Sequence, residues 1–207
     1  MTLESNKTLG GVGALLVVIG FLGFFGSGYA GLLILVGAIL TLIALKGFSD
    51  HYNEGGIFNN ALYSLVTAIV GVVAFIATII IMVIQTVLTG FTWTDPMAIQ
   101  QYFMEHMTDL WSIIATLIIA FVVLFVFFIV TAIFARKSLS LLSAKTGEKI
   151  FETAGLLWLI GAVLTIIAVG LILIWVAWIL IAVGFFSIKT QAAQQPLSTP
   201  QPPQPPP

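Results

Sequence analysis

Residues 151–188, FETAGLLWLIGAVLTIIAVGLILIWVAWILIAVGFFSI, form the apolar run that decides how the chain is threaded through a membrane. As one helix this run would be roughly 57 Å long at 1.5 Å per residue, whereas the hydrocarbon core of a bilayer is about 30 Å thick. We therefore expect two spans that divide near Gly170, although no polar residue marks the turn. The alternative of five spans would place Lys189 opposite the other basic residues, so six spans are favoured.

The rest of the chain supplies the other spans. Residues 9–45 are too long for one span, and Gly26-Ser27-Gly28 divides them with residues suited to a tight turn. Each of the runs 60–88 and 110–134 is long enough to cross once. The expected fold class is all-α, a polytopic transmembrane helical bundle over residues 1–190, with spans near 9–25, 29–45, 60–88, 110–134, 151–169 and 171–188.

Charge predicts the orientation of this bundle. The seven Lys and Arg residues fall in alternate polar stretches between the apolar runs, and the stretch 90–109 contains none of them. Basic loops stay on the cytoplasmic side of a membrane, so we expect a multi-pass protein of the cell (plasma) membrane with both termini in the cytoplasm. The basic residues are Lys7, Lys46, Arg136, Lys137, Lys145, Lys149 and Lys189.

The composition supports a membrane location for the chain and excludes several functions. Sixty per cent of the residues are hydrophobic and only 7% are charged, against about 25% charged in an ordinary soluble domain, so the lipid bilayer is the first expected partner. A net charge of −1 argues against nucleic acid, whose phosphates require a basic face. The absence of cysteine removes disulfides, thiolate catalysis and Cys-ligated zinc.

The predicted spans contain no ionisable residue in their interiors. Buried ionisable groups usually mark ion pathways, proton relays or catalysis in membranes, so we expect neither an enzyme nor a bound cofactor. The two histidines, His51 and His106, fall on opposite sides of the predicted membrane and cannot share a metal within one chain. Gln85 is the most polar residue of any span; it is either a hydrogen-bonding contact between helices or an amide that meets a solute.

The stretch 46–60, KGFSDHYNEGGIFNN, is the most distinctive connection in the chain. It is either a structured turn between the second and third spans, with Asn59 or Asn60 as the helix cap, or a docking surface for a cytoplasmic partner. The candidate partner-binding residues of this loop are Lys46, Ser49, Asp50, His51, Tyr52 and Glu54.

The outer segment 90–109 holds a second group of candidate residues. Asp95-Pro96 predicts an N-cap followed by the first turn of a short amphipathic helix that lies on the membrane surface. Glu105, His106 and Asp109 follow at helical spacings and could converge on a metal ion or a proton. Three neighbours on one helix rarely complete a metal site, so a solvated polar face is the simpler interpretation.

Two further features concern the organisation of the chain. Residues 191–207 are almost wholly Gln, Pro, Ala, Ser and Thr, a composition that cannot form a core and predicts a disordered cytoplasmic tail. Glu54-Gly-Gly-Ile-Phe-Asn-Asn-Ala and Gly147-Glu-Lys-Ile-Phe-Glu-Thr-Ala each lead into a span. These two stretches raise the alternatives of a duplicated helical hairpin and of chance similarity between loops.

Several strings in the first third of the chain carry a resemblance. They are Leu9-Gly-Gly-Val-Gly, Ile43-Ala-Leu-Lys-Gly-Phe-Ser-Asp-His-Tyr and Ile57-Phe-Asn-Asn-Ala-Leu. Together they resemble an archaeal family of multi-pass membrane proteins known only as domain of unknown function 996, over about residues 8–190. The resemblance implies an archaeal plasma membrane and a helical bundle, and it implies no activity, cofactor or catalytic residue.

These observations favour a non-catalytic membrane protein that acts by binding, as a scaffold, an assembly subunit or a regulator. Its partner would be another copy of the chain or a different membrane or cytoplasmic protein. The alternative is a channel or facilitator for a neutral or weakly polar small solute, which should show a continuous polar stripe through the bundle. A membrane enzyme is a weaker alternative, because only Glu105, His106 and Asp109 could supply its chemistry.

Overall fold

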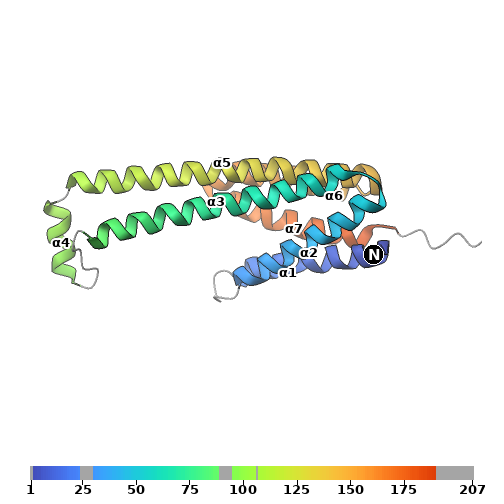
Figure 1. The fold of residues 1–207 in the computed structure, drawn as a ribbon, viewed down its shortest axis with the longest axis horizontal. Helices are drawn as coiled ribbons and strands as arrows, with labels where there is room; N and C mark the ends of the chain where they lie inside the picture. The colour runs from blue at the N-terminus through green and yellow to red at the C-terminus, as the bar shows by residue number, and fades with distance from the viewer. Residues whose placement is uncertain (1, 24–29, 89–94, 106, 190–207) are drawn as a thin grey trace, which may run out of the picture.

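The computed structural model describes residues 2–23, 30–88, 95–105 and 107–189 (Figure 1). The described chain is helical, and six of its helices are long and apolar enough to cross a membrane, which confirms the expected fold class. The elements are α1 (Leu3–Gly23), α2 (Ala30–His51), α3 (Gly55–Leu88), α4 (Pro96–Glu105), α5 (Met107–Thr146), α6 (Ile150–Leu164), the short 3-10 helix η1 (Thr165–Ile167) and α7 (Val169–Ser187).

Three antiparallel hairpins make up the bundle. They are α1–α2, α3–α5 and α6–α7, and in each hairpin the two helices pack against each other. Neighbouring hairpins meet through α2 with α3, α5 with α6, and α7 with α1. The six long helices therefore follow one another around a common centre.

The division of the last apolar run is confirmed. The helix breaks at η1, and Ala168 adopts the left-handed conformation (φ 62°) before α7 begins. Gly170 stands where a side chain would collide with the carbonyl oxygen of Gly161 and the backbone of Thr165. The close crossing of α6 and α7 explains why a glycine marks this turn although no polar residue does. The predicted turn at 26–28 and the tail 191–207 lie outside the described residues.

The helices run further than the predicted spans at one end of the bundle. Most of the stretch 46–60 is helical, because α2 continues to His51 and α3 begins at Gly55. Asn59 and Asn60 therefore do not cap α3; the Asn60 side chain instead donates to the carbonyl oxygen of Gly56 within the helix (2.7 Å). In the same way α5 continues past the predicted span 110–134, through most of the stretch that separates it from the next span, as far as Thr146.

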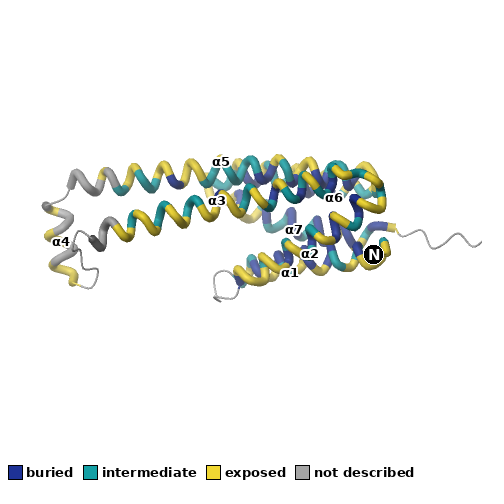
Figure 2. The backbone as a smooth tube through the Cα atoms, in the orientation of Figure 1, coloured by how far each residue is buried: buried dark blue, intermediate teal, exposed yellow. Residues whose placement is uncertain are grey.

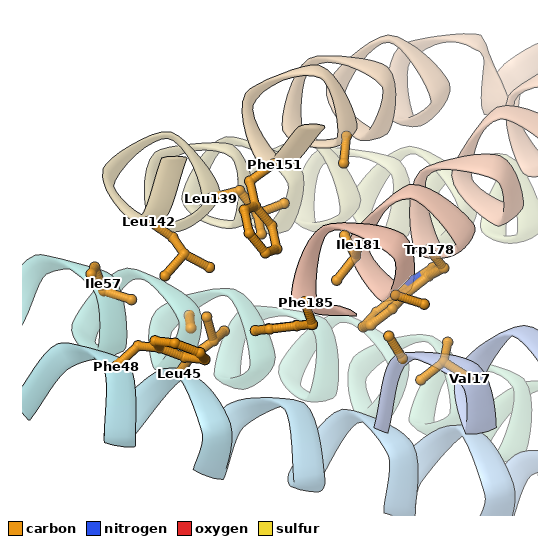
Figure 3. Packing of buried hydrophobic residues seen from close by; sticks show 14 of the residues in the cluster. Val17, Leu45, Phe48, Ile57, Leu139, Leu142, Phe151, Trp178, Ile181 and Phe185 are labelled. Carbon is orange, nitrogen blue, oxygen red and sulfur yellow. The ribbon is translucent and has the colours of Figure 1, made fainter. Parts of the chain in front are cut away.

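The core lies at the end of the bundle where α1 begins and α7 ends (Figures 1 and 2). Phe48, Phe151 and Phe185 are fully buried there, and their rings stack edge to face or in parallel with centroids 5.1–5.8 Å apart (Figure 3). Ile57 and Leu142 join this cluster from α3 and α5. One aromatic cluster therefore ties all three hairpins together.

The α3–α5 hairpin projects beyond the other four helices (Figure 1). With 34 and 40 residues, these helices are roughly 51 and 60 Å long at 1.5 Å per residue, well over the thickness of the hydrocarbon core. Their far halves are mostly exposed (Figure 2). Trp111 in this region is 71% exposed, as suits an aromatic residue at a membrane interface.

Candidate functional site: the basic end and the apolar cavity

All seven Lys and Arg residues lie at the end of the bundle that contains the aromatic cluster, which we call the basic end (Lys7, Lys46, Arg136, Lys137, Lys145, Lys149 and Lys189). The α2–α3 turn, the α5–α6 turn, the start of α1 and the end of α7 meet there (Figure 1). The Lys7 ammonium donates to the carbonyl oxygen of Ile188 (2.8 Å). This contact joins the first helix to the end of the last and places a cation at a helix C-terminus, where it stabilises the helix dipole.

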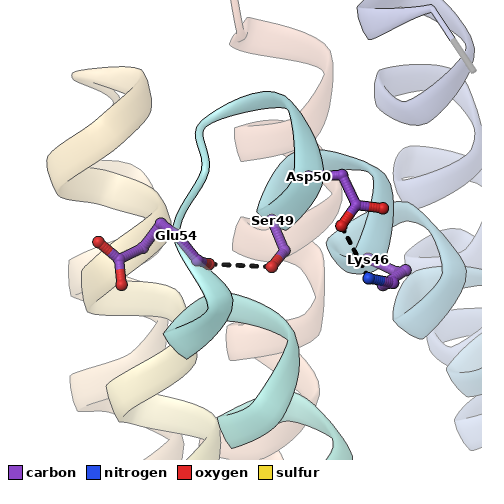
Figure 4. Close-up of polar contacts among 4 residues, drawn as sticks. All are labelled: Lys46, Ser49, Asp50 and Glu54. Atoms are coloured by element: carbon purple, nitrogen blue, oxygen red, sulfur yellow. Dashed lines mark hydrogen bonds and ion pairs between the residues drawn. The ribbon is translucent and has the colours of Figure 1, made fainter.

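Four of the six candidate partner-binding residues make contacts within the α2–α3 turn (Figure 4). Lys46 and Asp50 form an exposed ion pair one helical turn apart (2.7 Å), and the Ser49 hydroxyl donates to the backbone oxygen of Glu54 (2.9 Å). The Glu54 carboxylate also meets Lys145 of α5 (3.3 Å). These contacts support the interpretation of this stretch as a structured turn.

The other two candidates, His51 and Tyr52, continue the aromatic cluster toward the surface. Tyr52 stacks on Phe48 with ring centroids 6.4 Å apart, and the His51 ring meets the Tyr52 ring at its edge, 4.9 Å away. Burial raises the pKa of the Tyr52 hydroxyl above its ordinary value of 10.0. Tyr52 therefore packs as a neutral aromatic residue, while His51 is exposed.

The α5–α6 turn repeats the geometry of the α2–α3 turn. The Ser143 hydroxyl donates to the backbone oxygen of Glu148 (3.0 Å), which matches the contact between Ser49 and Glu54. The residue before each glutamate is left-handed, Asn53 with φ 50° and Gly147 with φ 78°. The two turns share this backbone geometry, but in a register shifted by one residue from the sequence likeness: the turns pair Glu54 with Glu148, whereas the likeness pairs Glu54 with Gly147. The geometry therefore does not decide between a duplicated helical hairpin and chance similarity.

Most of the polar residues predicted for the outer side of the membrane lie outside the described residues. The structure places Gln85 in α3 and Asp109 in α5 and ends α4 at Glu105, but the side chains of all three, and His106 entirely, lie outside the described residues. The predicted cap of α4 is confirmed, because the Asp95 carboxylate accepts a hydrogen bond from the backbone N–H of Met97 (2.9 Å). Within the part of the chain that is described, His, Asp and Glu form no group that could hold a metal ion.

A large apolar cavity lies between the six long helices, a feature that the sequence did not predict. Its volume is about 570 Å³, within the range of about 300–1,000 Å³ that is usual for ligand sites. None of its lining residues is ionisable. They are Val17, Phe21, Gly31, Ile34, Leu35, Ala38, Thr41, Leu42, Leu45, Ala61, Ser64, Leu65, Ala68, Ile69, Val72, Val73, Phe128, Thr131, Ala135, Ser138, Leu139, Trp158, Ile174, Trp178 and Ile181.

Three of the four hydroxyl groups on the cavity wall form hydrogen bonds to other groups of the protein. Thr41 donates to the carbonyl oxygen of Gly37 (2.9 Å), and Ser138 donates to that of Ile57 (2.7 Å). The Thr131 hydroxyl pairs with that of Thr67, 3.0 Å away. These groups bond within the protein, so the wall is more apolar in effect than its residue types suggest.

The mouth of the cavity lies between α2 and α3. Lining residues on these two helices are exposed, including Leu35 (46%), Ile69 (47%) and Val73 (59%), whereas those on α5, α6 and α7 are buried or half-buried. The two helices meet at their turn and diverge away from it (Figure 1). The cavity is thus closed at the basic end and open sideways, toward the surroundings of the bundle.

An apolar space of this size is costly to leave empty. A closed cavity costs about 24 cal/mol per Å³ when it is empty, so a fully enclosed space of this volume would cost on the order of 10 kcal/mol; because this cavity is open sideways, its cost is smaller. Water does not offset this cost, because a cavity holds water only where polar groups can bond it. An apolar occupant therefore suits this space better than water does.

Six apolar helices that surround an apolar cavity define a membrane-embedded helical bundle. The chain belongs to a protein family of unknown function, DUF996, whose profile matches residues 33–179. This match confirms the family resemblance. A similar protein is an uncharacterised one from Methanocaldococcus jannaschii, 30% identical over 188 residues, which cover 91% of this chain and 94% of the relative. No solved structure matches the chain.

Proposed function

We propose that this protein acts by binding inside the membrane, as a non-catalytic scaffold, assembly subunit or regulator, and that the apolar cavity is its binding site. The observation that carries the proposal is the cavity itself, with a volume of about 570 Å³, no ionisable lining residue and a sideways mouth. A site of this kind can recognise shape and apolar surface, but it offers no group for acid–base or nucleophilic chemistry.

The placement of ionisable residues supports a non-catalytic role. In the described part of the six long helices, Glu4, Lys7, Lys46, Asp50 and Glu152 lie toward helix ends, and Arg136 and Lys137 lie on the part of α5 nearest the basic end, where both are exposed. Enzymes that work within the bilayer usually keep such groups inside the bundle.

We infer that the basic end faces the cytoplasm of a cell whose plasma membrane holds the bundle. The inference is supported by the gathering of all seven basic residues at the end where α1 begins and α7 ends. Cytoplasmic loops carry an excess of Lys and Arg, and basic side chains near that surface are attracted to anionic headgroups. Lys137 and Lys149 are exposed and available for such contacts.

The test is to purify the protein from its native membranes in mild detergent and to measure its native mass together with whatever co-elutes. Wild type should carry a bound molecule, a protein or a lipid, at a defined stoichiometry. Ala68→Phe, which places a large side chain in the cavity, should lose it. Ala77→Phe makes the same change on the exposed face of α3 and should retain it. Equal binding by all three proteins would refute the proposed site.

A channel or facilitator for a neutral or weakly polar small solute is the second candidate, because the six helices surround the cavity. Such a protein needs polar groups along its path, and the described lining supplies only hydroxyls, most of them bonded within the protein. Flux of a neutral solute into liposomes that is lost in Ala68→Phe but kept in Ala77→Phe would favour this candidate over the scaffold.

A further inference from the structure

We propose that the occupant of the cavity is one hydrocarbon chain of a bilayer lipid, which enters sideways between α2 and α3. This inference rests on the proposed function, since it names the ligand of the same site. Three observations carry it: the taper of the cavity, the chemistry of its wall and the position of its mouth.

The taper of the cavity selects a thin occupant. At the basic end the lining residues Leu45 and Ala61 are only 6% and 9% exposed, and the α2–α3 turn closes the space. Further out, at Gly31, a side chain would meet no atom within 4 Å. An α-helix with its side chains is about 10–12 Å wide along its whole length, so it cannot follow the cavity inward. A single hydrocarbon chain can.

The wall offers dispersion contacts and little else. The rings of Trp158 and Trp178 lie with centroids 5.0 Å apart, and both line the cavity with Phe21 and Phe128. The indole Nε1 of Trp158 has no hydrogen-bond partner among the described residues, but this atom is itself buried and offers no exposed polar surface to a ligand. A ligand inside the cavity thus meets carbon atoms on several sides, which favours it over the looser packing of free lipid.

The mouth has the position that a lipid chain requires. Its exposed rim residues, Leu35, Ile69, Val72 and Val73, are aliphatic and belong to two helices long and apolar enough to cross the membrane. Lipid tails surround these helices in a bilayer, so a tail reaches the mouth without passing through water. Because the lining has no ionisable residue, the polar head of the lipid must stay outside.

A partner helix is the alternative occupant. Ala61, Ser64 and Ala68 form a row of small residues on the α3 wall, and such rows allow helices to approach closely. To use this row, a partner would have to part α2 from α3 near their turn. There Ser49 and Glu54 hold the backbone together, and Lys145 joins it to α5.

The first experiment uses the wild-type chain in vesicles of phosphatidylcholine whose acyl chains carry a photoreactive diazirine at mid-chain. After extraction and gel filtration have removed loosely held lipid, the sample is irradiated and the cross-linked peptides are identified. We expect cross-links at cavity-lining positions such as Ala38 and Ala68, and few at outward positions such as Ala77. Cross-links spread evenly over both faces, or none at all, would overturn the proposal.

The second experiment counts retained lipid by native mass spectrometry in wild type, Ala38→Phe, Ala68→Phe and the control Ala77→Phe. Wild type and the control should retain one lipid per chain. Each cavity variant should retain at least about tenfold less, which corresponds to a loss of about 1.4 kcal/mol. Equal retention in all four proteins would contradict the proposal. If a variant fails to fold, the cross-linking experiment on the wild-type chain still tests whether a lipid chain occupies the cavity.

The two proposals fail in different ways. A stoichiometric protein that is lost in the cavity variants, with no retained lipid, would leave the proposed function standing and refute the lipid chain as occupant. A wild-type chain that retains neither protein nor lipid would refute both.

Discussion

At the scale of single residues, three left-handed positions decide where helices end. They are Asn53 (φ 50°), Gly147 (φ 78°) and Ala168 (φ 62°). Asn and Gly adopt this conformation readily, whereas the Cβ of other residues is crowded there at a cost of roughly 1–2 kcal/mol. Ala168 bears this cost because the tight α6–α7 turn requires the conformation and its sequence supplies neither Gly nor Asn.

Replacing Ala168 by glycine should therefore stabilise the protein. We expect Ala168→Gly to raise the free energy of unfolding by about 1 kcal/mol, seen as a higher thermal midpoint in detergent. The control is Ala144→Gly, at an exposed position inside α5, which should lower stability by about 0.5–1 kcal/mol. A lower midpoint for Ala168→Gly would show that the turn does not strain this residue.

The two serine contacts allow a paired prediction. Ser49→Ala and Ser143→Ala each remove the hydroxyl that donates to a glutamate backbone oxygen, and each should cost about 1 kcal/mol of stability. Ser187→Ala is the control, because that hydroxyl only bonds the carbonyl of Val183 in its own helix. Thermal unfolding measures all three, and a loss in only one turn would contradict the equivalence of the two turns.

At the scale of helices, glycines set the closest approach between α1 and α2. A Cβ at Gly37 would lie 2.5 Å from the carbonyl oxygen of Gly13 and 2.9 Å from the backbone nitrogen of Val17. Small residues at helix crossings in lipid gain packing contacts that replace the hydrophobic drive available in water. The α1–α2 hairpin therefore depends on the absence of side chains at these positions.

This dependence is testable within one helix. Gly37→Ala must push α1 and α2 apart, and overpacking of this kind usually costs about 1–3 kcal/mol. Gly31→Ala is the matched control in α2, because its side chain would meet no atom and alanine favours a helix over glycine by about 1 kcal/mol. The thermal midpoint should fall for Gly37→Ala and should stay the same or rise for Gly31→Ala. Equal effects of the two substitutions would contradict the close approach of α1 and α2 at Gly37.

The number of long helices was predictable from the sequence, but their ends and rotations were not. Apolar runs separated by polar stretches predict spans directly, and the break near Gly170 followed from the length of the last run and from the position of Lys189. Helices continue past the bilayer until a turn stops them, so the extension of α2 to His51 and of α5 to Thr146 depended on the Ser49 and Ser143 turns. The cavity was missed because helices that are apolar on every face give no signal of which face points inward.

At the scale of the whole molecule, packing falls off from the basic end outward. The aromatic cluster around Phe185 buries all three hairpins together, whereas the far halves of α3 and α5 have few neighbours (Figures 2 and 3). Inside a membrane, lipid takes the place of the missing neighbours. The lateral cavity lies between these two regions, where the helices diverge but still surround a common space.

The α6–α7 turn leads to a prediction about depth in the membrane. From Glu152 at the basic end to Ile166 in the turn, a helical chain rises only about 21 Å, less than the roughly 30 Å of a hydrocarbon core. Ile166 is 75% exposed and its neighbour Ile167 is 62% exposed, so both should face lipid tails below the outer surface of the membrane.

Because the chain contains no cysteine, single substitutions report accessibility without background. We expect Met97→Cys, on α4, to react with a membrane-impermeant maleimide from outside intact cells, and Lys189→Cys, at the basic end, to react only after the cells are opened. Ile166→Cys should stay unlabelled in both cases and react once detergent replaces the bilayer. Labelling of Ile166→Cys in intact cells would place the turn in water, and labelling of Lys189→Cys from outside would reverse the inferred orientation.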